Sequence, residues 1–187
     1  DVPDSMLSLT FDDGPDPNYT PQILDILKAK NIKATFFIVG NRAEYNPELI
    51  RRIYEEGHEI GNHTFTHPNL TKVNNLQIYL EVKSTQKLLS SILGKNTLLF
   101  RPPYGIDSNP QTIEEIKSLE LINRMGMYTV GMELDPKDWD TDDPGDIALN
   151  LYDQLNSSSG NIILLHDAGG NREATIKALP QIIDFMQ

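Results

Sequence analysis

The sequence predicts an α/β fold on a parallel sheet, and it favours a closed barrel over an open doubly wound sheet. Strand-like and helix-like stretches alternate along the 187 residues, without hairpin signals between them. Five polar clusters each follow a short β-type stretch. All βα loops of a barrel face one mouth, whereas an open sheet gathers its ligands mainly at one switch point. Because fewer than eight units are recognisable, we expect an irregular barrel.

The first half of the chain contains three predicted strands and three predicted helices. Pro21 fits the first turn of a helix, and Gly57 and Gly94 each follow the end of one. The apolar stretch at 33–40 is rich in β-branched and aromatic residues, so it could be buried on both faces. Residues 40–47 are interpreted as a brief connection. The predicted strands are 6–12, 33–40 and 58–63, and the predicted helices are 20–30, 47–56 and 76–93.

The second half repeats the alternation. No internal repeat, low-complexity segment or long linker divides it from the first half, so we expect one catalytic domain over residues 1–187. The predicted strands are 98–101, 128–134 and 161–166, and the predicted helices are 110–119, 145–155 and 174–186.

Composition narrows the classes of function. A formal net charge of −11 argues against a nucleic-acid partner, which would need a basic patch. No apolar stretch is long enough for a membrane span. The chain has no cysteine, so a metal site would have to use histidines and carboxylates. It begins at Asp1 without a methionine, which indicates a processed chain or a piece of a larger one.

The strongest metal signal is the pair His63 and His67. In an extended segment, residues four apart share a face but lie roughly 13 Å from each other. Two imidazoles on one zinc need bonds of about 2.0–2.1 Å each, so this segment must coil. A carboxylate from another strand end would complete a His-His-Asp set, which is the usual form of a hydrolytic metal site.

Asp12 and Asp13 compete for the role of that carboxylate. Neighbours on a strand point to opposite faces, so both can reach one site only where the chain bends. Gly14 and Pro15 supply such a bend. One aspartate could then bind metal while the other acts as a base, and the residues alone leave open which does which.

Arg101 ends a strand and precedes two prolines that stiffen the loop after it. A buried guanidinium needs a carboxylate partner, and the free aspartate of the pair is suited to this role. Main-chain N–H groups of such a loop can stabilise an oxyanion, which makes the backbone of Tyr104 a candidate.

His166 ends the last predicted strand and suits proton donation to a leaving group. Either Asp138 or Asp167 could orient its ring. Trp139, the only tryptophan, could line an apolar pocket with Leu164.

Taken together, the five clusters resemble the motifs of a known family. The chain is similar to polysaccharide deacetylases of carbohydrate esterase family 4, the NodB-homology domain. The resemblance implies a distorted (β/α)7 TIM-like barrel and one divalent cation, usually Zn²⁺, with Co²⁺ as an alternative. The clusters read TFDDG at 10–14, HTFTH at 63–67, RPPYG at 101–105, DPKDW at 135–139 and LLHD at 164–167.

The same resemblance implies a role for each matching residue. Asp12 would be the general base, with Arg101 as its partner, and His166 the general acid, oriented by Asp138. Tyr104 would offer its backbone N–H to the oxyanion. The metal ligands would be Asp13, His63 and His67, and Trp139 and Leu164 would line the pocket for the acetyl methyl group.

The expected activity is hydrolysis of an N-acetyl group on N-acetylglucosamine-containing glycans such as chitin oligomers, peptidoglycan or exopolysaccharide. Two alternatives remain: O-deacetylation of acetylxylan, and a carbohydrate-binding module that has lost turnover. Short connections indicate an open groove rather than a closed pocket for a small cyclic amide. The resemblance further implies a monomeric catalytic domain that acts outside the cell or at its surface.

Overall fold

A curled parallel sheet forms the centre of the molecule. The computed structural model describes residues 6–107, 110–157 and 160–187. Within these residues, six strands lie in the order β5-β4-β3-β2-β1-β6, and every pairing is parallel. This confirms the predicted α/β class and the parallel sheet. The strands are β1 (Ser8–Asp12), β2 (Thr35–Ile38), β3 (Glu59–Asn62), β4 (Leu99–Phe100), β5 (Tyr128–Thr129) and β6 (Ile162–His166).

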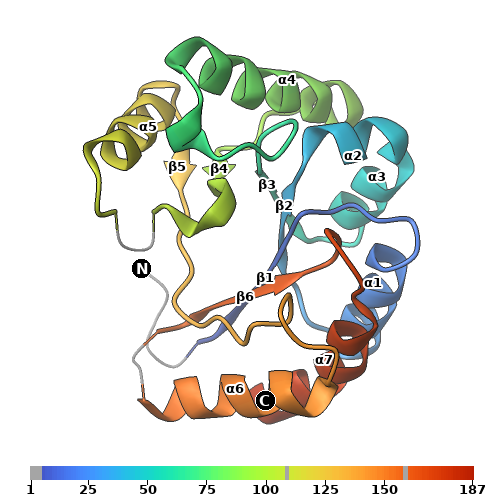
Figure 1. The fold of residues 1–187 in the computed structure, drawn as a ribbon. Helices are drawn as coiled ribbons and strands as arrows, with labels where there is room; N and C mark the ends of the chain where they lie inside the picture. Colours follow the sequence, from blue (N-terminus) through green and yellow to red (C-terminus); the bar gives the residue numbers. More distant parts are fainter. Residues whose placement is uncertain (1–5, 108–109, 158–159) are drawn as a thin grey trace.

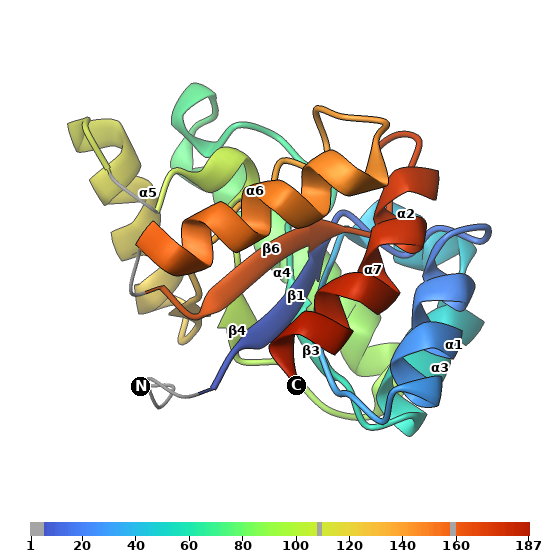
Figure 2. The same cartoon turned by 90° about the horizontal axis from the view of Figure 1, so that it is seen from below.

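Helices cover the outer face of the curled sheet, as Figure 1 shows. Each helix packs on its neighbours, in the order α5, α4, the pair α2 and α3, α1, α7 and α6. In the view of Figure 2, α6 and α7 lie in front of β6 and β1. The helices are α1 (Thr20–Ala29), α2 (Gly40–Tyr45), α3 (Pro47–Glu55), α4 (Asn75–Leu93), α5 (Ile113–Arg124), α6 (Pro144–Ser157) and α7 (Glu173–Met186), with short 3₁₀ turns η1 (Leu70–Lys72) and η2 (Pro103–Gly105).

The segment 128–134 corrects one prediction and explains how the barrel is completed. The sequence suggests a single strand there, but only Tyr128–Thr129 pairs regularly, with β4. The chain then leaves that strand, and Leu134 forms a parallel bridge to Ile163 of β6 at the opposite edge of the sheet. Backbone hydrogen bonds at both ends, such as Val130 N to Phe100 O at 2.8 Å, hold this crossing. One segment therefore joins both edges, consistent with the distorted (β/α)7 barrel.

Two helices differ from the sequence prediction. The supposed connection 40–47 contains the helix α2, whose Ala43 side chain is fully buried. Helix α5 begins at Ile113 rather than near 110 and continues to Arg124. Its start is set by a capping box, in which Thr112 and Glu115 each bond the other's backbone N–H. A single Gly or Pro signal is a weaker guide to a helix end than such a reciprocal cap.

The main core lies between the sheet and the helices around it. The side chains of Phe36, Phe37 and Ile38 are completely buried, so the prediction that β2 is covered on both faces is confirmed. A smaller apolar cluster under α4 and α5 includes Phe100 and Ile122. In the described part of the chain, no helix combines the length and the apolar character that crossing a bilayer requires.

Candidate active site

A single pocket lies at the carboxyl ends of the strands and receives residues from all five sequence clusters. Its volume is about 540 Å³. Asp13, His63, Arg101, Trp139 and His166 are among the residues that line it, and each comes from a different cluster. Parallel strands place their carboxyl ends at one edge, which is why clusters far apart in sequence meet here.

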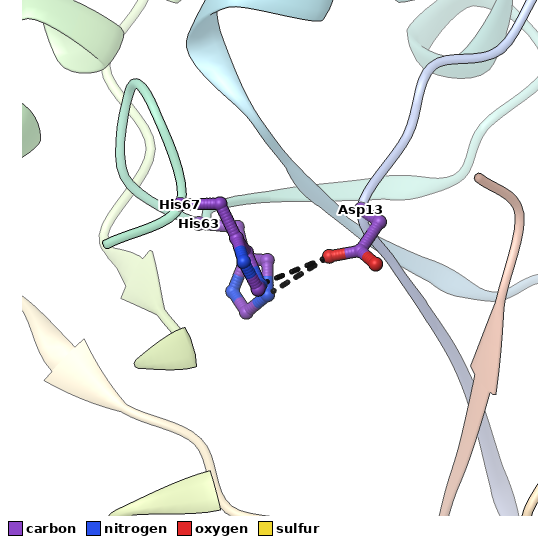
Figure 3. Close-up of side chains that lie close together, drawn as sticks. All are labelled: Asp13, His63 and His67. Atoms are coloured by element: carbon purple, nitrogen blue, oxygen red, sulfur yellow. Dashed lines mark ion pairs between the residues drawn. The ribbon is translucent and has the colours of Figure 1, made fainter. Parts of the chain in front are cut away.

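Asp13, His63 and His67 form a compact group of potential metal ligands (Figure 3). Asp13 Oδ1 lies 3.5 Å from His63 Nε2 and 3.1 Å from His67 Nε2. Ligand atoms about 2.0–2.2 Å from one tetrahedral zinc lie roughly 3.3–3.6 Å apart, close to this spacing. Two imidazoles and one carboxylate are also a usual donor set for a catalytic zinc. The residues therefore fit the cation that the resemblance implies.

The orientation of the His63 ring supports this fit. His63 Nδ1 lies 2.7 Å from the carbonyl oxygen of Arg101. A carbonyl only accepts hydrogen bonds, so Nδ1 carries the proton and Nε2 of the neutral ring presents a lone pair. A cation and a proton are therefore alternatives at Nε2: the neutral ring can share a cation with the Asp13 carboxylate, whereas the protonated ring donates to that carboxylate.

The coil that the histidine spacing requires is present between residues 63 and 67. Thr64 and His67 both have positive φ, at 69° and 61°. Asn62 Oδ1 accepts a hydrogen bond from Thr64 N at 2.9 Å, and Thr64 Oγ1 accepts one from His67 N at 3.1 Å. These side-chain bonds replace the backbone pairing that ends with β3.

Asp13 is turned toward the histidines by the bend at the end of β1. Its φ is 76°, and the following Gly14–Pro15 peptide is cis. Burial raises the pKa of Asp13, but hydrogen bonds and charge from His63 and His67 oppose it and hold that pKa well below its ordinary value. Gly169 approaches the second carboxylate oxygen so closely that a Cβ there would clash with it. A glycine at 169 therefore leaves room for the Asp13 side chain.

Asp12 contacts Arg101, while Asp13 lies against both histidines. Arg101 Nη1 donates to Asp12 Oδ1 at 2.8 Å and to Thr10 Oγ1 at 2.7 Å. Its Nε and Nη2 donate to the carbonyls of Val130 and Gly131. The guanidinium is almost completely buried, and its planar fork is held at several points. The structure thus separates the two aspartates that the residues alone left equivalent.

His166 is held by Asp138. Its Nδ1 lies 2.7 Å from Asp138 Oδ1, and its backbone N donates to Asp138 Oδ2 at 2.9 Å. Burial lowers the pKa of His166, but the Asp138 bond and charge outweigh it, so that pKa is raised. Asp167, the other candidate, accepts a 2.6 Å bond from Thr20 Oγ1 instead, and burial raises its pKa to about 7. Asp167 directly follows His166, and successive strand residues point to opposite sides, so the Asp167 side chain points away from the His166 ring.

The three remaining predicted residues also line the pocket. Tyr104 has a φ of 65°, unusual for a bulky residue, and its ring lies 4.9 Å from that of His67. Trp139 is 51% exposed and donates through Nε1 to Asp135, whereas Leu164 is buried. This exposure leaves the Trp139 ring available to a ligand.

Two polar residues in the pocket were not identified from the sequence. Asp107 follows the RPPYG cluster, and burial raises its pKa to about 6. Its Oδ2 is buried and has no hydrogen-bond partner among the described residues. Arg172 donates to the carbonyls of Ala168 and Asp138. Neither belongs to a cluster at a strand end, which was the signal that located the other residues.

Comparison with known proteins agrees with this geometry. Residues 1–123 match the family model described as polysaccharide deacetylase. A peptidoglycan-N-acetylglucosamine deacetylase from Bacillus cereus is 39% identical over 95% of this chain. A chitooligosaccharide deacetylase from Azorhizobium caulinodans is 34% identical over 98% of this chain and 89% of the relative. The solved structure of the Bc1960 peptidoglycan N-acetylglucosamine deacetylase superposes with a TM-score of 0.87 at 38% identity, over 97% of this chain and 81% of that one.

Two further facts bear on how far these similarities reach. The chain spans 62% of the length of the Bacillus cereus relative. A CE4 family pseudoenzyme from Bacillus anthracis also shares the fold, with a TM-score of 0.82 at 26% identity, over 97% of this chain and 60% of that one. A shared fold therefore does not by itself establish turnover, and the side chains of the site carry that argument.

Proposed function

Because the chain belongs to the polysaccharide deacetylase family, we propose that it hydrolyses the N-acetyl group of N-acetylglucosamine residues in peptidoglycan. The products are acetate and a free amino sugar in the polymer. A divalent cation held by Asp13, His63 and His67 takes part, with Zn²⁺ favoured and Co²⁺ as the alternative. The reaction class is hydrolysis of a carbon–nitrogen amide bond other than a peptide bond.

One observation carries this proposal: two oriented dyads lie beside the group of metal ligands in one pocket. Arg101 holds Asp12, and Asp138 holds His166. Asp12 and His166 are register partners on the adjacent strands β1 and β6. Amide hydrolysis needs a base for the attacking water and an acid for the leaving amine, and this pair supplies both from neighbouring positions.

Asp12 accepts the proton from the attacking water. Arg101 orients that carboxylate and balances its charge, while the bond from Arg101 to Thr10 fixes the guanidinium in turn. When bound, the cation supplies Lewis acidity, which polarises the acetyl carbonyl and favours ionisation of water. The backbone N–H of Tyr104, on the stiff loop after β4, donates to the oxygen that gains negative charge.

His166 protonates the departing nitrogen. An amine is a poor leaving group unless it receives a proton, so cleavage of the C–N bond depends on this step. Asp138 keeps Nδ1 of His166 protonated, and the ring therefore directs Nε2 to the substrate. Trp139 and Leu164 line the part of the pocket that receives the acetyl methyl group.

Peptidoglycan is proposed as the substrate because both the Bacillus cereus relative and the superposed structure carry that name. Chitooligosaccharides are the next candidate, as the Azorhizobium relative is named for them. Acetylxylan remains a third, since an acetate ester needs the same base and less help from the acid. A peptidoglycan substrate places the reaction outside the cytoplasm, and we propose that one domain over residues 1–187 performs it as a monomer.

A binding module without turnover is the competing function, because a pseudoenzyme shares this fold. The presence of Asp12, Arg101 and His166 in hydrogen-bonded positions favours an active enzyme.

Measuring acetate release distinguishes an active deacetylase from a binding module without turnover, and it identifies the substrate. Purified protein is incubated with peptidoglycan, N-acetylated chitooligosaccharides and acetylxylan, with and without chelator. We expect release from N-acetylglucosamine substrates that chelator abolishes and Zn²⁺ restores. The variant Asp12→Asn is the matched control, because it keeps the metal ligands and loses the base. Binding of glycan without acetate from any substrate would support the silent module instead.

A further inference from the structure

We propose that Glu81, on helix α4, is a positioning residue that shapes the loop between His63 and His67 so that both rings can hold one divalent cation. The inference rests on the metal site of the proposed function. Glu81 lies 14 residues or more from the histidines along the chain and belongs to none of the five clusters. The packing of α4 against β3 brings Glu81 next to the loop.

Three hydrogen bonds join the Glu81 carboxylate to the loop. Its Oε2 accepts from Phe65 N at 2.8 Å and from Thr66 N at 2.7 Å, and its Oε1 accepts from Thr66 Oγ1 at 2.7 Å. Two consecutive backbone N–H groups therefore point at one oxygen. A carboxylate is suited to this role because it accepts at both oxygens and donates at neither.

Glu81 is buried, so these hydrogen bonds replace the ones that its carboxylate would make with water. The residue is 8% exposed, and within the described residues its carboxylate takes part in no ion pair. A buried carboxylate without a basic partner is costly unless hydrogen bonds satisfy its oxygens. Among the residues that the structure describes, the hydrogen bonds to this carboxylate come from Phe65 and Thr66, both in the loop.

The opposite side of the loop is held by helix α2. Gly40 N donates to Thr64 O and Asn41 N donates to Phe65 O, both at 2.9 Å. The peptide between Phe65 and Thr66 is thus held from α2 through a carbonyl and from α4 through Glu81. A second anchor from α4 is the bond from Asn62 Nδ2 to Val82 O at 2.9 Å.

This double attachment maintains a backbone that would otherwise relax. Thr64 and His67 both have positive φ, which costs free energy for residues other than glycine. Without the carboxylate, Phe65 N and Thr66 N lose their partner, and the loop has less to oppose that cost. We therefore expect the His67 ring to lose its fixed distance from Asp13 Oδ1.

The test measures Zn²⁺ affinity by competition with a chromophoric chelator, with no substrate present. Three variants separate reach from charge. Glu81→Ala removes the carboxylate, and Glu81→Asp keeps the charge but shortens the side chain. Glu81→Gln keeps the reach without the charge: its oxygen still accepts from Phe65 N and Thr66 N, and its NH₂ group donates to Thr66 Oγ1. Glu55→Ala, at an exposed glutamate on α3, controls for loss of one negative charge. Circular dichroism checks that each variant is folded.

We expect Glu81→Ala and Glu81→Asp to weaken Zn²⁺ binding about 10- to 100-fold, the usual effect of losing a group that orients a ligand. Glu81→Gln should stay close to the unchanged protein, as should Glu55→Ala. In a His67→Ala background, Glu81→Asp should add little, because the loop no longer carries a ligand for it to place.

Equal affinity in Glu81→Asp and the unchanged protein would overturn the inference, as would a loss in Glu81→Gln as large as in Glu81→Asp. If Glu81→Ala does not fold, the comparison of Glu81→Asp with Glu81→Gln still tests the inference. Failure of the unchanged protein to bind Zn²⁺ would instead count against the metal site of the proposed function.

Discussion

Replacing Asp138 by asparagine should shift the pH dependence of deacetylation. Asp138 Oδ2 accepts from His166 N and from Thr175 Oγ1, whereas Oδ1 contacts His166 Nδ1. The single oxygen of an asparagine should stay with the two donors and leave its NH₂ group facing Nδ1. The imidazolium would then lose its acceptor and meet a donor, so the pKa of His166 should fall.

The size of the shift follows from the bond that is lost. A hydrogen bond to a charged group contributes about 1.5–3 kcal/mol, and one pKa unit corresponds to about 1.36 kcal/mol. The pKa of His166 should therefore drop by roughly 1–2 units. A general acid must be protonated to act, so activity falls as the pH rises through its pKa. The alkaline limb of the kcat profile should move to lower pH by the same amount.

Two measurements check this prediction. Acetate release is followed against pH for both proteins, and the pKa of His166 is measured directly by NMR, since the chain has only four histidines. Asp140→Asn, two residues away at an exposed position, removes one charge without touching His166 and should leave the limb in place. An alkaline limb and a His166 pKa that do not change in Asp138→Asn would refute the reasoning.

Five other variants test the remaining roles. Asp12→Asn should lower turnover by about 10²–10⁴-fold, the usual contribution of a general base, while metal analysis after dialysis finds the ion retained. Asp13→Ala or His67→Ala should lose metal and activity together, and activity without metal would contradict the ligand set. His166→Ala should reduce amide hydrolysis far more than release from an acetate ester, and equal losses would argue against the acid role. Arg101→Met should destabilise the fold by about 3–5 kcal/mol in urea titrations, because it removes the guanidinium partner of the buried Asp12 carboxylate.

The architecture was largely predictable because it depends on local pattern. Alternating strands and helices without hairpins require a parallel sheet, and the burial of β2 on both faces follows from its uninterrupted apolar residues. The segment 128–134 was harder, because whether it forms one strand or crosses between two sheet edges depends on strands distant in sequence. Helix α2 was missed for a related reason: six residues carry too little periodicity to be distinguished from a loop.

The site was predictable to the extent that its residues follow strands. Parallel strands end at one edge, so polar clusters after them must meet, whatever the exact path of the loops. Asp107 and Glu81 could not be found this way, because one lies in a loop and the other on a helix. Their positions depend on how the chain returns to the pocket, which has no local signature.

By itself, the sequence determined which chemical groups are available and that they gather at the mouth of one barrel, since residue type and strand order settle both. Only the tertiary structure decided how those groups are paired. Asp13 rather than Asp12 lies against both histidines, and Asp138 rather than Asp167 holds His166. The physical reason is that hydrogen bonds act over about 3 Å, so a pairing depends on backbone turns such as the positive φ of Asp13 and on contacts between segments far apart in the chain.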